Sequence, residues 1–362
     1  MKKVFASFLS LVLALGVFCL PTKAAVDETA LQDSYEKVKA YYESQDALYD
    51  PFEVMAVEAL GLEAENYNVP EFYDESSNYT PSDLAKIIIA NMLMKKDPRD
   101  VNGTDLVAML EACVDDSGRI HYDGQPALEA SAHVWCLFAF ECVKSPLAEK
   151  AADGLCVQQY SDGGFSWTAE GSNAYAASDP DTTGWCINAL VQMKKAKYQV
   201  TIDKAVDYLT NAQQADASWG DWGANSNTQA CVLNGLIAIQ KEEVLDGRYD
   251  KNGVSPLSVL FSFQNEQGSF GWNSTTHVSG STAQAAMFLG ELFNGSIVAR
   301  AQSEYATWKD SNVLDSNPKD ENTVVENKNN GPKTGDSHSA ESLLLVMGIC
   351  LCVMVRRGYA QN

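Results

Sequence analysis

The chain has 362 residues, and its 48 acidic residues outnumber 26 lysines and arginines, giving a formal net charge of −22 at pH 7. Such acidity argues against nucleic acid as a partner, because its phosphates would be repelled. The hydrophobic fraction of 46% is ordinary for a globular protein, so the chain can build a core of one or two domains.

The first 24 residues have the pattern of a secretory signal peptide. Lys2 and Lys3 are followed by an apolar run from Val4 to Leu20 and then by small residues. A charged start, an apolar middle and a small-residue end are the features of such a peptide, and we place the cleavage after Ala24. An uncleaved membrane anchor is the alternative. The sequence therefore predicts an exported protein.

Six of the nine cysteines lie outside the terminal hydrophobic segments. An exported protein can form disulfides, but their pairing cannot be deduced from spacing. Most of the six lie in apolar stretches, where buried free thiols that act as small hydrophobes are expected. No Cys-x-x-Cys or paired Cys/His spacing indicates structural zinc, so no metal site is predicted. The six are Cys113, Cys136, Cys142, Cys156, Cys186 and Cys231.

One turn pattern returns along the central part of the chain. Its clear copies are Gln159 to Phe165, Gln213 to Trp219 and Gln264 to Phe270, and a fainter copy is Val114 to Ile120. The first residues of successive copies are separated by 45, 54 and 51 residues. Repeats of that length indicate stacked supersecondary units.

Each turn is expected to join two helices of different character. The segment before it is amphipathic, as in residues 202–209, and the segment after it is more apolar, as in residues 183–190. An amphipathic helix alternating with an apolar one indicates an outer and an inner layer. Further helices are predicted at Pro51 to Leu62 and Pro81 to Met94, and strand-like alternation is weak. We therefore predict an all-α fold, an α/α toroid, over residues 25–301.

A polar stalk is predicted at residues 302–330, followed by a C-terminal signal at residues 331–362. That signal contains Gly-Pro-Lys-Thr-Gly-Asp, an apolar stretch from Leu343 to Val355 and two arginines. It resembles the cell-wall sorting signal of Gram-positive surface proteins. The resemblance implies that sortase and the cell wall are partners and that cleavage falls between Thr334 and Gly335. A plain transmembrane anchor is the alternative, and both readings place the protein at the cell surface.

The repeat turns look like those of the prenyltransferase and squalene-cyclase repeat. The closest stretch is Gln159 to Phe165 followed by Ser178 to Thr183, and Asn227 to Ala230 and Ser281 to Gln284 open the later helices. The combination is most similar to the toroid of the cobalamin carriers intrinsic factor and transcobalamin and of related bacterial surface proteins. This resemblance, over about Thr104 to Asn294, implies the toroid fold and a corrinoid ligand. The small β domain that closes over the corrin in the carriers is not found in this sequence.

Asp179-Pro180-Asp181-Thr182 resembles the Asp-x-Asp-Asp motif of class II terpene cyclases. In that family the middle Asp, here Asp181, protonates an alkene or epoxide in a dry pocket with aromatic faces that stabilise cations. The fourth position here is Thr182. The alternative is a helix start, with Asp179 as the N-cap, Pro180 in the first helical position and Asp181 in the first turn. We favour the capping interpretation.

Three other chemistries are alternatives for this sequence. Cys156 and Gln159 have the spacing that complement-type thioester proteins use, although Gln159 already opens a repeat turn. Protein prenyltransferases bind zinc on a toroid, but the histidines here are isolated: His121, His133 and His277. A pair of carboxylates across a toroid could hydrolyse glycans, with these candidates: Glu129, Asp179, Asp181 and Asp221.

The remaining pattern is aromatic. Four tryptophans follow the repeat turns, and with two polar neighbours they form the predicted ligand-binding set: Trp167, Trp219, Trp222, Trp272, Tyr175 and Asn173. Loops on one face of a toroid would carry them together, which suits a flat or amphipathic ligand such as a sugar or corrin ring. The alternative is that they are core plugs of each repeat.

The sequence as a whole predicts a surface-anchored toroid that binds a small molecule, glycan or protein without catalysis. No cofactor is assigned beyond the corrinoid that the resemblance implies. An enzyme that uses Asp181 and a thioester adhesin remain as alternatives.

Overall fold

The computed structural model describes residues 27–122, 125–126, 130–168, 176–220 and 223–315. These residues belong to one compact unit, Met1–Asp315, and the predicted signal peptide and C-terminal signal lie outside the described ranges. Among the described residues, no helix combines the length and the apolar character needed to cross a bilayer.

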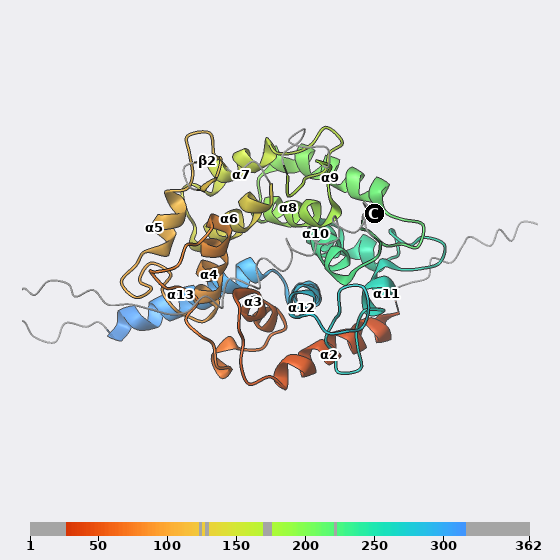
Figure 1. Cartoon of the computed structure of the whole chain (residues 1–362), viewed down its shortest axis with the longest axis horizontal. Coiled ribbons are helices and arrows are strands. Elements are labelled where there is room, and N and C mark those ends of the chain that lie inside the picture. The colour runs from red at the N-terminus through yellow and green to blue at the C-terminus, as the bar shows by residue number, and fades with distance from the viewer. Residues whose placement is uncertain (1–26, 123–124, 127–129, 169–175, 221–222, 316–362) are drawn as a thin grey trace, which may run out of the picture. The chain divides into compact units, whose positions relative to one another are not determined.

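An inner ring of six helices is formed within the described ranges (Figure 1). Each helix packs against the next one along the chain, and the last packs against the first, so that the ring closes. The ring consists of α3 (Pro51–Ala59), α4 (Pro81–Leu93), α6 (Ala130–Val143), α8 (Pro180–Gln192), α10 (Ser226–Leu245) and α12 (Ser279–Asn294).

A second layer of helices packs on the outside of this ring. In order these are α2 (Glu28–Glu43) on α12, α5 (Leu106–Glu111) on α4, α7 (Ala148–Cys156) on α6, α9 (Gln199–Ala212) on α8, and α11 (Pro256–Phe261) on α10. The last helix, α13 (Ile297–Asp315), packs against α3, α4 and α6. The alternation of outer and inner helices confirms the predicted all-α toroid.

Short elements complete the connections. They are the 3-10 turns η1 (Ala64–Asn66) and η2 (Ala196–Tyr198) and an antiparallel hairpin of β1 (His121–Tyr122) and β2 (Gln125–Pro126). In the hairpin His121 lies opposite Pro126 and Tyr122 lies opposite Gln125.

The starts of the inner helices follow from their sequences. Asp50 and Asp179 each accept backbone N–H groups of the first turn, and a proline follows each of them in the first helical position. Thr80 and Asp83 form a capping box at the start of α4, where the two side chains accept from each other's backbone N–H. These caps fix where the inner helices begin.

The glutamine that opens a repeat turn joins neighbouring repeats. Gln159 Nε2 donates to a carbonyl of its own turn and to Thr201 O at the start of α9, both at 2.8 Å. Gln264 does the same in the last repeat, and its second acceptor is Ser34 O of α2, at 3.0 Å. The repeat contact therefore also closes the ring, because α2 takes the place that the next outer helix has in earlier repeats.

Candidate functional site

One face of the toroid carries the repeat turns together with the N-terminal ends of the inner helices; we call it the turn face. In each inner helix from α6 onward, the side chain of the fourth residue forms a hydrogen bond with the backbone of the buried plug residue of a turn. The bonds are Ile120 N to His133 Nε2 at 3.2 Å, Phe165 N to Thr183 Oγ1 at 2.9 Å, Gln229 Nε2 to Trp219 O at 2.9 Å, and Phe270 N to Thr282 Oγ1 at 3.0 Å.

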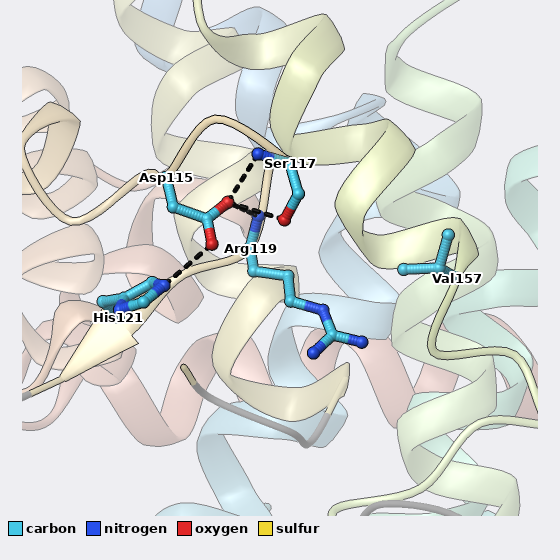
Figure 2. A pocket seen from close by; sticks show the side chains of 5 residues that line it. All are labelled: Asp115, Ser117, Arg119, His121 and Val157. Atoms are coloured by element: carbon cyan, nitrogen blue, oxygen red, sulfur yellow. Dashed lines mark hydrogen bonds and ion pairs between the residues drawn. The ribbon is translucent and has the colours of Figure 1, made fainter. Parts of the chain in front are cut away.

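A pocket of about 440 Å³ lies at the first of these turns, and we call it the turn pocket (Figure 2). It is lined by Asp115, Ser117, Arg119, His121 and Val157. One carboxylate oxygen of Asp115 accepts from Ser117 N, Ser117 Oγ and Arg119 N, at 2.8, 2.7 and 3.0 Å. The other lies 2.8 Å from His121 Nε2. Hydrogen bonds from Ser117 and then from His121 hold the pKa of Asp115 well below its usual range, so this turn is fixed around a carboxylate.

Asp179 fixes the turn before α8 in two ways. Its Oδ1 accepts from Thr182 N at 2.8 Å, which is the N-cap bond, and its Oδ2 accepts from Trp167 N at 3.1 Å. Its own N–H donates to Phe165 O at 2.8 Å. The prediction that Asp179 caps this helix, with Pro180 next to it, is confirmed. Asp179 is therefore a structural residue of the turn face.

Asp181 lies in the first turn of the same helix and interacts with Asp179. Burial and then the charge of Asp181 raise the pKa of Asp179, and burial raises the pKa of Asp181. The pair therefore retains a proton at pH values where exposed carboxyl groups have lost theirs. Burial and then the charge of Asp181 also raise the pKa of Cys231 in α10. The charge of Asp181 is therefore felt at a buried residue of the neighbouring inner helix.

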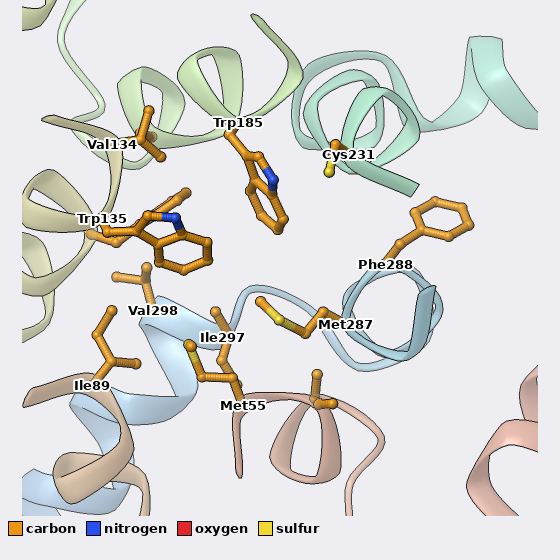
Figure 3. Packing of buried hydrophobic residues seen from close by; sticks show 14 of the residues in the cluster. Met55, Ile89, Val134, Trp135, Trp185, Cys231, Met287, Phe288, Ile297 and Val298 are labelled. Atoms are coloured by element: carbon orange, nitrogen blue, oxygen red, sulfur yellow. The ribbon is translucent and has the colours of Figure 1, made fainter. Parts of the chain in front are cut away.

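Aromatic side chains fill the interior below these carboxyl groups. The rings of Trp135 and Trp185 are 5.2 Å apart, and both residues are only 8% exposed. Figure 3 shows both indoles directed into the ring, where they meet Met55, Met287 and other apolar side chains. The centre of the ring at this level is therefore packed with side chains.

One lysine lies over this aromatic group. Lys86 Nζ is 5.2 Å from the ring centroid of Phe52 and 5.8 Å from that of Trp135. Burial lowers the pKa of Lys86, while the nearby Asp83, at 3.8 Å, acts in the opposite direction. The sequence interpretation missed Lys86, Phe52 and Trp135. Their place in the first two turns of apolar inner helices, the position that Asp181 also has, is the feature that could have identified them.

The predicted aromatic set divides into different environments. Trp167 is 50% exposed beside Asp179. Trp219 is fully buried and its Nε1 donates to Leu209 O at 2.8 Å, so it has the core-plug role and offers no surface to a ligand. Trp272 is half-buried, and its carbonyl accepts from Ser226 N at the start of α10. The other predicted residues lie outside the described ranges: Tyr175, Asn173, Trp222, Glu129, Asp221, Thr334 and Gly335.

The thioester and zinc alternatives find no support in the described residues. The amide nitrogen of Gln159 already donates to two carbonyls, and burial raises the pKa of Cys156, which disfavours the reactive thiolate. All six cysteines in the described ranges are free thiols. Within the described ranges, no group of three His, Cys, Asp or Glu side chains could hold a metal ion.

No protein-family model matches this sequence. No curated protein matches it significantly. Among solved structures, ent-copalyl diphosphate synthase from Streptomyces platensis is similar with a TM-score of 0.47 and 16% identity, over 71% of this chain and 50% of that one. Polysaccharide lyase BACCELL_00875 has a TM-score of 0.46 and 12% identity, over 81% of this chain and 99% of that one. This chain thus spans half the length of the synthase, and at these TM-scores neither neighbour assigns it an activity.

Proposed function

We propose that this protein is an exported toroid, held at the cell surface by its C-terminal signal, that binds a flat or amphipathic ligand on its turn face. The observation that carries the proposal is Trp167, which exposes half of its side chain on a fixed backbone. Its N–H is held by Asp179, and the neighbouring Ser166 O accepts from Ala130 N at 3.1 Å. A large aromatic surface that is already ordered loses little entropy on binding.

The surroundings of Trp167 favour binding over catalysis. Both carboxylate oxygens of Asp179 are occupied by backbone N–H groups, so this residue is committed to the turn. Polar side chains also lie near the starts of other inner helices, such as Glu53 in α3 and Lys86 in α4. A ring-shaped ligand with an apolar face and polar edges, such as a sugar or a corrin, has the matching chemistry.

The signal peptide and the sorting signal support placement at the cell surface. Both are features of the sequence, and they make sortase and the cell wall the proposed partners. A polar stalk ahead of Thr334 would hold the toroid away from the wall, with its turn face available to ligands in the medium.

The experiment uses residues 25–315, which can be produced alone because the ring closes and the core forms within this unit. Cyanocobalamin and a panel of oligosaccharides are titrated by calorimetry and by tryptophan fluorescence. We expect one ligand class to bind and Trp167→Ala to weaken it about tenfold or more. Trp308→Ala, in α13, is the matched control and should leave binding unchanged. Equal binding by Trp167→Ala and the parent protein would refute this site.

A second candidate is an acid-catalysed reaction at Asp181. The observation that favours it is a carboxyl group with a raised pKa above the indoles of Trp135 and Trp185. Incubation with squalene-type and glycan substrates tests it. Product that disappears in Asp181→Asn, while Asp181→Glu retains some turnover, would replace the binding proposal by an enzyme.

A further inference from the structure

The turn pocket contains an arginine whose guanidinium group makes no contact that the fold depends on. Four arginines lie in residues 25–315. Arg300 Nη2 is 2.6 Å from Glu58, Arg99 Nη1 is 3.4 Å from Asp105, and Arg248 lies over the ring of Tyr249. Within the described ranges, the guanidinium group of Arg119 has neither an ion pair nor a hydrogen bond.

The position of Arg119 is fixed although its side-chain end is free. Its backbone N–H donates to Asp115, and the preceding Gly118 packs so closely on α7 that a Cβ there would stand 2.0 Å from Lys150 O. Figure 2 shows the side chain extending from this turn toward Val157. The guanidinium group is thus presented from a rigid turn, which lowers the cost of ordering it around a ligand.

The neighbouring carboxylates are held by groups other than the guanidinium group of Arg119. Asp115 lies 2.8 Å from His121 Nε2, and Asp116 is paired with Lys150 at 3.4 Å. Asp115 has both oxygens occupied, so it does not need the guanidinium group. A single free guanidinium group matches one planar, singly charged anion better than a polyanion, since it can donate two parallel hydrogen bonds to a carboxylate.

The opposite wall of the pocket is apolar. Val157, the C-cap of α7, is 66% exposed and lines the pocket. A volume of about 440 Å³ is enough for a short peptide end rather than for a large cofactor. We propose that the turn pocket binds the carboxyl terminus of a peptide whose last residue is small and apolar, with the carboxylate on Arg119 and the side chain on Val157.

This site is separate from the proposed ligand surface at Trp167, so either can fail without the other. A uronic acid carries the same carboxylate, but its hydroxyl groups would lie against Val157, which offers them no hydrogen-bond partner. The peptide terminus is therefore the occupant that the pocket favours, and the uronic acid serves as the competing ligand in the test.

The test uses residues 25–315 with ¹⁵N-labelled arginine, whose four Nε–Hε signals are assigned by single substitutions. N-acetylalanine is titrated, with N-acetylalaninamide as the neutral analogue and glucuronate as the competing acid. We expect saturable shifts of the Arg119 signal with N-acetylalanine, and at least tenfold weaker binding of the amide and of glucuronate. Arg119→Met should abolish the binding, Arg119→Lys and Val157→Ser should weaken it severalfold, and Arg248→Met should leave it unchanged.

Arg119→Met should also keep the melting temperature of the parent protein, because no described residue depends on this guanidinium group. Equal binding of the acid and the amide would overturn the carboxylate assignment. Equal or tighter binding of glucuronate would overturn the peptide assignment. Shifts of Arg248 or Arg99 in place of Arg119 would remove the site altogether.

Discussion

Asp179 and Asp181 lie close together at the start of α8, but we expect substitutions of the two to have different effects on stability. Asp179 caps the helix, whereas Asp181 is a buried carboxyl group with a raised pKa. Asp179→Ala removes the N-cap bond to Thr182 and leaves the N–H of Trp167 without its acceptor. Losing a cap costs about 1 kcal/mol. A fully buried N–H without a partner would cost about 1–3 kcal/mol more, and the partly buried N–H of Trp167 belongs at the lower end of that range. We expect Asp179→Ala to lower the free energy of unfolding by about 2 kcal/mol.

Asp181→Asn should have the opposite sign at neutral pH. Asp181 is not the N-cap of α8, and burial raises its pKa in the folded state more than its hydrogen bonds lower it. A group whose pKa is raised on folding gives stability that is fully present below its unfolded pKa and is lost as the pH rises through the folded pKa. An uncharged amide of the same shape removes this loss. We expect Asp181→Asn to be neutral or stabilising at neutral pH and to flatten the decline of stability above about pH 4.

Urea unfolding of residues 25–315 at several pH values measures both effects. Asp179→Asn is the control, since its amide oxygen can still cap the helix and should recover most of the loss seen with Asp179→Ala. The reasoning is refuted if Asp181→Asn destabilises the protein as much as Asp179→Ala, or if the parent protein shows no decline in stability between pH 4 and neutral pH.

Other parts of the fold give three further predictions. Gly268→Ala should severely destabilise the closure of the ring by α2, because φ is 93° there and a Cβ would stand 2.0 Å from Lys37 O. We expect faster proteolysis between α2 and α3 in this variant, and unchanged resistance to protease would contradict the prediction. Arg300→Met should lower the free energy of unfolding by about 3–5 kcal/mol, because it leaves the buried Glu58 without its ion-pair partner. Urea unfolding measures this loss, which should become smaller in acid as Glu58 is protonated. Methylamine should add no mass to the native protein, and a one-to-one adduct at Gln159 would restore the thioester.

The toroid could be predicted from the sequence because its signals are local. Alternation of apolar and amphipathic segments and the glutamine-led turns both repeat at short range. The closure of the ring by α2 could not be predicted, because α2 lacks a repeat turn of its own. It is placed by contacts between residues far apart in the sequence, such as the bond from Gln264 to Ser34. Lys86, Phe52 and Trp135 come from three different helices. Their places near helix starts could be read from the sequence, but their mutual contact depends on how the helices pack.

The tryptophans show where a closer reading of the repeat would have helped. Trp219 occupies the position that Phe165 and Phe270 occupy in their turns, and all three are fully buried. Trp167 and Trp272 come two residues after that position and are more exposed. Alignment of the turns therefore separates plug from surface, whereas counting aromatic residues near a turn does not.

The convergence of six inner helices on the turn face would by itself indicate an anion site, because helix N-termini attract negative charge. In three of these helices a carboxylate already lies at the start and interacts with that end of the helix. Asp50, Asp83 and Asp179 place carboxylates at three of the helix starts, so a free anion there meets negative charge first. In the turn pocket an anion instead meets the guanidinium group of Arg119, so we expect anions to bind there before they bind at these capped helix starts. Titration with inorganic phosphate checks this: shifts at the first turns of α3, α4 and α8 would show that the helix ends still attract anions despite their caps.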